Sequence, residues 1–308
     1  MLTTYPLETA PARAPVWLDL AEPTPDELRE AGKRLGAALP PREEISSIAL
    51  SKRMRASPEM ISINLPAFAR AEAGQGMMTP LGIVVTPELL VTTRYAESEA
   101  FKRLADAVAA AAPTLTSIDA FVLLFESIVS AASDRMQRLS VELSEVSHQT
   151  FCDTRGHSQN LRGVLFRIGR IQRQVTQTRS ATLGVQRGLM HLCDAAPPWI
   201  DKTHLGRLRV ALEDVHALGE FDQQLDDKVQ FLLDAALGFI NNDQNDIIRV
   251  LTIASVVTIP PMILAGIWGM NFKSIHEYDW PHGYAYALAM IVLSMILPLA
   301  WFKWKKWF

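Results

Sequence analysis

The stretch IIRVLTIASVVTIPPMILAGIWGMNF, residues 247–272, decides the fold of this chain. Its first 22 residues carry a single charge, Arg249, and a helix of about 20 apolar residues is long enough to cross a bilayer. A second apolar run follows at Gly283–Trp304, after a short polar segment. We therefore predict a two-helix transmembrane domain over residues 247–308, with an outer loop over 272–282.

The charges beside the two spans predict their orientation. Three lysines, Lys303, Lys305 and Lys306, lie at the end of the second span, whereas the loop between the spans has one lysine and two acidic residues, one of which is Glu277. Because basic residues gather on the cytoplasmic side, we expect the C-terminus inside and the loop outside. The first residues show no basic segment followed by an apolar run, so no signal peptide is expected. We thus predict a multi-pass protein of the plasma (inner) membrane with both termini in the cytoplasm.

Composition argues against several other function classes. The formal net charge is -3 at pH 7, which gives no reason to expect a nucleic-acid partner. Cys152 and Cys193 are isolated and are expected to be reduced thiols. The sequence contains no P-loop, no Gly-rich nucleotide fingerprint and no nucleophile with a matching base. We therefore expect neither an enzyme activity nor a resident cofactor.

Residues 1–112 mix strand and helix patterns, which predicts an α/β domain. Thr24 is a suitable helix N-cap, with Glu27 three residues later to complete a capping box. Alternating apolar and polar residues indicate strands, whereas apolar residues spaced by three and four indicate helices. On these criteria we expect strands at 16–20, 59–68, 80–86 and 88–95, and helices at 24–36, 40–54 and 100–112.

Long helices are predicted after the α/β domain. Residues 113–198 contain two of them, at 117–150 and 161–190. The second carries a run of arginines that either face solvent or approach acidic residues of a neighbouring helix. These are Arg162, Arg167, Arg170, Arg173 and Arg179.

A third long helix begins near Lys202 and meets no strong breaker before the membrane. Continued to Gly266 it has 65 residues and, at ~1.5 Å per residue, a length of about 97 Å. The hydrocarbon core accounts for only ~30 Å, so residues 199–246 are expected to form a cytoplasmic stalk that needs neighbouring helices. The predicted fold class is α+β, with a mixed α/β cytoplasmic domain and a helical stalk continuous with the first membrane helix.

One face of this helix is polar where the rest of the span is apolar. Polar groups inside a bilayer are costly unless they are paired or face water. The face therefore either lines an aqueous path or packs against helices through its small residues. A lone two-helix hairpin cannot enclose a path, so a path needs several copies around an axis, where ringed carboxylates and amides would attract a cation. The face comprises Asp234, Gly238, Asn241, Asn245, Ile248, Thr252, Ser255 and Ile259.

The sequence Gly269-Met270-Asn271, at the end of the first span, resembles the signature of CorA-type magnesium transporters. Its context is similar too, with a short acidic loop, a second span, a lysine-rich end and the stalk segment LLDAALGFINNDQND. The resemblance covers residues 200–308. It implies a homopentamer with a funnel-shaped cytoplasmic part, in which Gly269, Met270 and Asn271 form the outer selectivity ring.

The resemblance also implies roles for matched residues. Asn245 would form a polar ring at the cytoplasmic mouth, Leu251 the hydrophobic gate and Thr252 the adjacent pore wall. Glu277, in SIHEYDW, would be the acidic loop residue, although the family's usual Met-Pro-Glu-Leu reads Ile-His-Glu-Tyr here. Ile259 stands where some members carry methionine and keeps that constriction apolar. The other pore-lining candidates are Asn241 and Ser255, and the candidates for magnesium sensing between subunits are Asp234, Glu213 and Asp214.

These features predict a divalent-cation channel that takes up Mg²⁺ down its electrochemical gradient, with Co²⁺ and Ni²⁺ as further candidate ions. Mg²⁺ is expected to be both the substrate and the regulatory ligand, since cytoplasmic Mg²⁺ would screen the acidic stalks and close the gate. A zinc transporter of the ZntB type is one alternative, but that group usually reads Gly-Val-Asn, so Met270 argues against it. A non-conducting, membrane-anchored oligomeric scaffold is the other alternative, and it needs no polar face.

Overall fold

The computed structural model describes residues 2–5, 15–46, 54–70, 76–111, 115–152, 157–270, 280–305 and 307. The chain divides into two compact units. The first unit contains the sheet and the long helices that pack on it, and the second contains the membrane helices. The first comprises Met1–Thr154 with Arg162–Leu233, and the second comprises Arg155–Leu161 with Asp234–Phe308.

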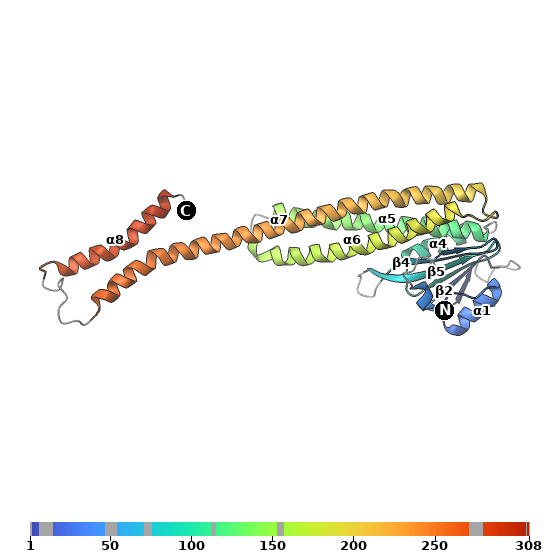
Figure 1. The fold of residues 1–308 in the computed structure, drawn as a ribbon, viewed down its shortest axis with the longest axis horizontal. Coiled ribbons are helices and arrows are strands. Elements are labelled where there is room, and N and C mark those ends of the chain that lie inside the picture. The colour runs from blue at the N-terminus through green and yellow to red at the C-terminus, as the bar shows by residue number, and fades with distance from the viewer. Residues whose placement is uncertain are drawn as a thin grey trace. The chain divides into compact units, whose positions relative to one another are not determined.

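The described residues of the first unit form a six-stranded sheet (Figure 1). Its strand order is β1-β2-β6-β5-β4-β3, and neighbouring strands are antiparallel except for the parallel pair of β2 and β6. Helices α1 and α2 lie between β2 and β3, and α4 follows β6, so the mixed α/β prediction is confirmed. The elements are β1 (Leu2–Tyr5), β2 (Trp17–Ala21), α1 (Pro25–Leu35), α2 (Arg42–Ile45), β3 (Met54–Ala56), β4 (Ile61–Arg70), β5 (Gly76–Val85), β6 (Leu90–Arg94) and α4 (Glu99–Ala111).

Helix α1 begins as the sequence predicts. The Thr24 hydroxyl accepts a hydrogen bond from the Glu27 amide at 3.3 Å, and a Glu27 carboxylate oxygen accepts one from the Thr24 amide at 2.8 Å. This capping box satisfies two backbone donors that the first turn leaves free. The helix ends at Gly36, whose φ of 75° lies in the left-handed region that glycine adopts without strain.

The prediction of a helix over residues 40–54 is wrong in its second part. Helix α2 ends at Ile45, and Met54 begins strand β3, where it is paired with Ile63 of β4. The intervening residues 47–53 lie outside the described part of the chain. Pairing with β4 supplies the backbone hydrogen bonds of β3, and such tertiary pairing overrides the helical pattern of the local sequence.

Long helices follow the sheet, and the first part of α5, the last part of α6 and the first part of α7 share its hydrophobic core (Figure 1). Trp17 of β2 and Ile83 of β5 belong to the same buried cluster as Phe121, Leu189 and Leu208 of the helices. This core therefore continues across the change in composition at residue 112. The helices are α5 (Ser117–Cys152), α6 (His157–Asp194) and α7 (Lys202–Trp268).

The arginine run of α6 approaches acidic residues for part of its length. Arg170 donates to Glu142 of α5 at 2.6 Å, and Arg167 donates to Gln149 at 2.7 Å and to Glu145 at 3.4 Å. The prediction that these arginines approach acidic residues of a neighbouring helix is thus confirmed for Arg167 and Arg170. Because these pairs lie near solvent, each is worth only about 0–1 kcal/mol.

Helix α6 lies against strand β4 at a glycine. A Cβ atom on Gly184 would stand 2.7 Å from Cγ and Cδ of Pro66, closer than carbon atoms approach without a shift, whereas a Cβ on Gly169 meets nothing within 4 Å. We expect Gly184→Ala to lower the free energy of unfolding by about 1–3 kcal/mol relative to Gly169→Ala, since overpacking a core costs that much. Both changes gain the same helix propensity, so the comparison isolates the contact. Thermal unfolding of the full-length variants in detergent measures it, and equal midpoints would contradict the close approach.

The second unit contains the C-terminal part of α7 and helix α8 (Gly283–Trp304). Among the described residues, α7 and α8 are the helices long and apolar enough to cross a membrane. Helix α7 is continuous for 67 residues and passes through Pro260 and Pro261. Almost no residue of either apolar segment is buried within the chain. Both predicted spans are therefore present as helices whose apolar surfaces are left for lipid or for other chains.

Candidate functional site

The polar face predicted on the third long helix lies on one uninterrupted helix in the structure. We call it the polar seam: Asp234, Gly238, Asn241, Asn245, Ile248, Thr252, Ser255 and Ile259, all on α7. At about 100° per residue these positions fall within an arc of roughly 100°. At ~1.5 Å per residue the seam from Asp234 to Ile259 is about 38 Å long. A continuous helix can therefore present these side chains as one straight wall.

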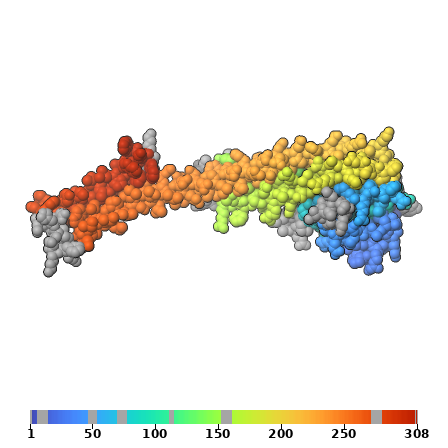
Figure 2. All heavy atoms as spheres, in the orientation of Figure 1, coloured from blue at the N-terminus to red at the C-terminus, as the bar shows by residue number. Residues whose placement is uncertain are grey.

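The seam is open on the described chain. Ile248 is 59% exposed and Leu251, beside the seam, is 65% exposed. In Figure 2 the last part of α7, in orange, is visible on the face shown, with the red helix α8 along its upper edge. A bare apolar surface of this size needs lipid or other protein chains to cover it. The seam therefore lies on a surface that the described chain leaves uncovered.

Both hydroxyl groups of the seam are bound back to their own helix. Thr252 Oγ1 donates to the carbonyl oxygen of Ile248 at 2.8 Å, and Ser255 Oγ donates to the carbonyl oxygen of Leu251 at 2.8 Å. The donor protons are thus used within the helix, and the oxygen lone pairs stay available as acceptors. Acceptor oxygens of this kind suit a cation or its water shell.

The Gly-Met part of the signature directly follows α7. The amide of Gly269 donates to the carbonyl of Ala265 at 3.0 Å, and the amide of Met270 donates to that of Ile267 at 3.3 Å. The side chain of Met270 is 47% exposed. Asn271 and Glu277 lie outside the described residues, so their expected roles stay predictions.

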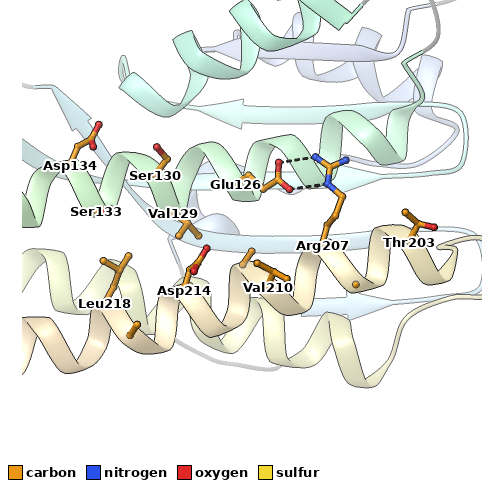
Figure 3. A pocket seen from close by; sticks show the side chains of 13 residues that line it. Glu126, Val129, Ser130, Ser133, Asp134, Thr203, Arg207, Val210, Asp214 and Leu218 are labelled. Carbon is orange, nitrogen blue, oxygen red and sulfur yellow. Dashed lines mark hydrogen bonds and ion pairs between the residues drawn. The ribbon is translucent and has the colours of Figure 1, made fainter.

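The other acidic candidates lie in the first unit. Asp214 of α7 lines a groove of about 820 Å³ together with Asp134 and Glu126 of α5 (Figure 3). Glu213, one residue before Asp214, is exposed and does not line the groove. The described residues contain no group of three or more His, Cys, Asp or Glu side chains that is ready to hold a metal ion. The structure thus brings Asp214, but not Glu213, next to acidic partners.

The acidic groups of the groove differ in how they are satisfied. Glu126 accepts two hydrogen bonds from Arg207, at 2.9 and 2.8 Å, and this interaction raises the pKa of Arg207. Asp134 is paired with Arg103. Asp214 has no ion-pair partner within 4.0 Å in the part of the chain that the structure describes. Of the three carboxylates, Asp214 is therefore the one most able to take a cation.

Sequence reasoning missed the α5 side of this groove. Glu126, Ser130 and Asp134 are spaced by four residues, so they share one face of a helix. That spacing is visible in the sequence, but it does not say which helix this face meets. The neighbour follows only from the parallel packing of α5 and α7, for which the Glu126–Arg207 pair is direct evidence.

A histidine joins the start of α7 to the start of α5. His204 Nε2 lies 2.9 Å from Asp119 Oδ1, and His204 Nδ1 lies 2.7 Å from Asp201 Oδ1. Burial raises the pKa of Asp119, but hydrogen bonds from Thr116 and His204 outweigh it and leave the pKa below its ordinary value. These contacts hold the first turn of α7 and so position the groove that follows it.

Comparison with known proteins agrees with the fold and with the Gly-Met-Asn resemblance. The magnesium transport protein CorA of Escherichia coli strain K12 is 28% identical over 303 residues, covering 97% of this chain and 94% of that protein. The complete structure of the CorA magnesium transporter from Methanocaldococcus jannaschii matches with a TM-score of 0.78 at 17% identity, covering 100% of this chain and 98% of that chain.

A ZntB cytoplasmic domain from Vibrio parahaemolyticus also shares the fold, with a TM-score of 0.57 at 14% identity over 77% of this chain and 91% of that chain. At these identities both structural likenesses concern the fold alone. The family model described as CorA-like Mg²⁺ transporter protein matches residues 13–305, which is nearly the whole chain. The chain therefore belongs to the family of CorA-like Mg²⁺ transporter proteins.

Proposed function

We propose that this protein is a channel that carries Mg²⁺ across the membrane down its electrochemical gradient. The observation that carries the proposal is the polar seam, which is exposed on one continuous helix and leads to the Gly-Met-Asn signature. Family membership supports a divalent-cation transporter, and the relatives named for magnesium support Mg²⁺ as the first ion to test. Co²⁺ and Ni²⁺ are further candidate substrates. The mechanism needs no resident cofactor.

Conduction requires assembly, because one seam is only one wall of a path. We propose a homopentameric funnel in which copies of α7 surround an axis, as the family resemblance implies. Asp234, Asn241 and Asn245 then form rings that attract cations on the cytoplasmic side, and Thr252 and Ser255 present acceptor oxygens within the span. Leu251 and Ile259 supply apolar constrictions, and a ring of apolar side chains stops ions by excluding water.

The outer entrance is assigned to Gly269, Met270 and Asn271. Mg²⁺ binds oxygen and gives up its water shell reluctantly. A ring of neutral amides and carbonyls holds the hydrated ion and still releases it, whereas ringed carboxylates at this point would hold it longer. In a plasma (inner) membrane with both termini in the cytoplasm, Glu277 lies in the outer loop and attracts cations to the entrance. An inside-negative potential then drives entry with ~2.3 kcal/mol per charge per 100 mV.

Gating is proposed to depend on Mg²⁺ at acidic residues of α7. Asp214 fits a regulatory cation because it lines the groove beside Asp134 and Glu126 without a partner of its own. A cation there reduces the repulsion among these carboxylates. Asp234 acts in the same sense as a ring in the assembly, and Glu213, which faces away from the groove, would act only in a site shared with another copy. Loss of cytoplasmic Mg²⁺ then lets the α7 helices separate and open the gate.

The function is tested by flux into liposomes that contain the purified full-length protein, with several divalent ions outside and Mg²⁺ varied inside. Mg²⁺ influx should fall as internal Mg²⁺ rises. Asp214→Asn should weaken this inhibition about tenfold, which corresponds to the loss of about 1.4 kcal/mol of binding free energy. Glu213→Gln is the matched control with the neighbouring residue, and it should change inhibition less. Inhibition that is unchanged in Asp214→Asn would contradict the role of the groove.

The same assay separates the two alternatives. A zinc transporter of the ZntB type would carry Zn²⁺ in preference to Mg²⁺, and the shared cytoplasmic fold keeps this alternative open to test. An oligomeric scaffold would carry neither ion. Absence of flux in well-assembled protein would therefore reject the channel, whereas a Zn²⁺ preference would reject only the choice of ion.

A further inference from the structure

A carboxylate lies buried between two long helices without a hydrogen-bond donor among the described residues. Asp222 of α7 is 1% exposed, and neither of its oxygens accepts a hydrogen bond from the described residues. The nearest cation is Arg179 of α6, whose Nε stands 3.9 Å from Asp222 Oδ2, beyond hydrogen-bond distance, and whose side chain is half exposed. An ionised carboxylate in such a position is destabilising, because it has lost its water without gaining donors.

The surroundings of Asp222 provide acceptors rather than donors. Asp226, one turn further along α7, accepts from Gln172 of α6 at 2.7 Å and from Gln230 at 3.4 Å. The side-chain oxygen of Gln172 is itself buried without a donor among the described residues. These buried oxygens therefore lack hydrogen-bond donors, and a neutral Asp222 would supply an O–H donor that its ionised form lacks.

The charged groups that act on Asp222 come from α6 and α7. Burial raises the pKa of Asp222 to about 6, with Arg179 acting to lower it and Asp226 to raise it. On α5, Arg135 lies over the ring of Phe68 and keeps two buried nitrogens without a partner among the described residues, whereas Glu142 accepts from Arg170. Neither of these groups is among the charges that shift the pKa of Asp222.

A metal ion is a poorer fit than a proton at this position. The guanidinium of Arg179 already brings a positive charge to 3.9 Å from Asp222, and like charges at such distances repel. Asp222 and Asp226 share one helix face, but Asp226 already accepts two hydrogen bonds. A proton needs only one carboxylate oxygen and adds no bulk to the packed interface.

We propose that Asp222 is a proton-binding site between α6 and α7, and that its protonation strengthens the packing of these two helices. The proposal does not rest on ion conduction, since it concerns the stability of the first unit. A carboxyl group that binds protons more tightly in the folded state stabilises that state as pH falls. The pKa of the Asp222 carboxyl is about 6 in the folded protein and has its ordinary value of 3.8 when exposed. The contribution of Asp222 to folding stability therefore changes between these two pH values and is unfavourable above the upper one. The packing of α6 on α7 should therefore be stronger at pH 5 than at pH 7.5.

The test uses full-length protein in detergent and compares variants at the same pH by hydrogen exchange of peptides from α6 and α7. Asp222→Asn imitates the neutral group, so at pH 7.5 its amides in these peptides should exchange tens of times more slowly than those of the unchanged protein, and on the order of a hundredfold more slowly at most. At pH 4.5 the difference should have fallen to several-fold, because the contribution of Asp222 changes between pH 3.8 and about 6. Comparison at equal pH removes the intrinsic pH dependence of exchange. Asp227→Asn is the matched control, because Asp227 lies five residues further along the same helix and is exposed, and its effect should not vary with pH.

A second variant checks the direction of the electrostatic effect. Arg179→Gln removes the cation that favours the ionised form of Asp222. In protein that carries Arg179→Gln, the slowing of exchange by Asp222→Asn should therefore begin to decline at a higher pH than it does with Arg179 present. A difference between Asp222→Asn and the unchanged protein that is the same at every pH would overturn the proposal. So would protection by added Mg²⁺ or Na⁺ at pH 7.5 in the unchanged protein alone, because it would assign the site to a metal ion.

Discussion

Asn271→Ala should reduce Mg²⁺ uptake to background while the protein still assembles and enters the membrane. The reason is that Asn271 supplies the neutral amide ring assigned to the entrance, and alanine removes every side-chain oxygen of that ring. Loss of even one tenfold factor in ion capture corresponds to about 1.4 kcal/mol, and five amides are lost together in a pentamer. Uptake into liposomes measures the effect, and size-exclusion chromatography in detergent reports the assembly.

Asn242→Ala is the matched control for that variant. Asn242 is an exposed asparagine of the same helix, but it lies about 100° away from Asn241 on the helix surface and therefore off the seam. Its replacement should leave uptake within about twofold, since the residue has no assigned place on the path. Normal uptake in Asn271→Ala would refute the filter assignment, even if the protein proved to be a channel.

The elements that depend on local pattern were predictable from the sequence. The second span was placed at its observed bounds, Gly283–Trp304, because apolar length alone decides it. Thr24 and Glu27 marked the start of α1, since a capping box uses only neighbouring residues. The absence of breakers predicted that α7 runs on into the membrane, and it does so to Trp268.

What sequence reasoning missed depends on contacts between distant segments. Strand β3 forms because β4 lies beside it, so Met54 was placed in a helix. Asp222 looks like any polar residue of a solvated stalk, and only the packing of α6 shows that it is buried. The groove at Asp214 needed the position of α5 relative to α7. The partners of Asp222 and Asp214 lie more than 30 residues away in the chain, which periodicity cannot reveal. Met54 pairs with Ile63, only nine residues on, but its local pattern does not show that pairing.

Leu251→Ala should open the channel when internal Mg²⁺ is high, raising flux under these closing conditions by about tenfold. A narrow ring of leucine side chains blocks ions because water does not fill it, and shorter side chains let water enter. Leu251 is 65% exposed on the described chain and directly precedes Thr252, so an assembly must either turn it to the path or cover it with a neighbour. Flux into liposomes at high and low internal Mg²⁺ measures the change, which should be much smaller at low internal Mg²⁺.

Val250→Ala separates gating from a general loosening of the helix. Val250 is 67% exposed and lies about 100° from Leu251, on the face of the helix opposite the seam, so its truncation should leave the response to internal Mg²⁺ unchanged. If both variants leak equally, the effect belongs to helix packing. If Leu251→Ala weakens assembly without changing flux, Leu251 contacts a neighbouring helix and the path faces Thr252 instead. The pair therefore determines the rotation of α7 about its own axis, which decides which side chains of the seam an ion meets.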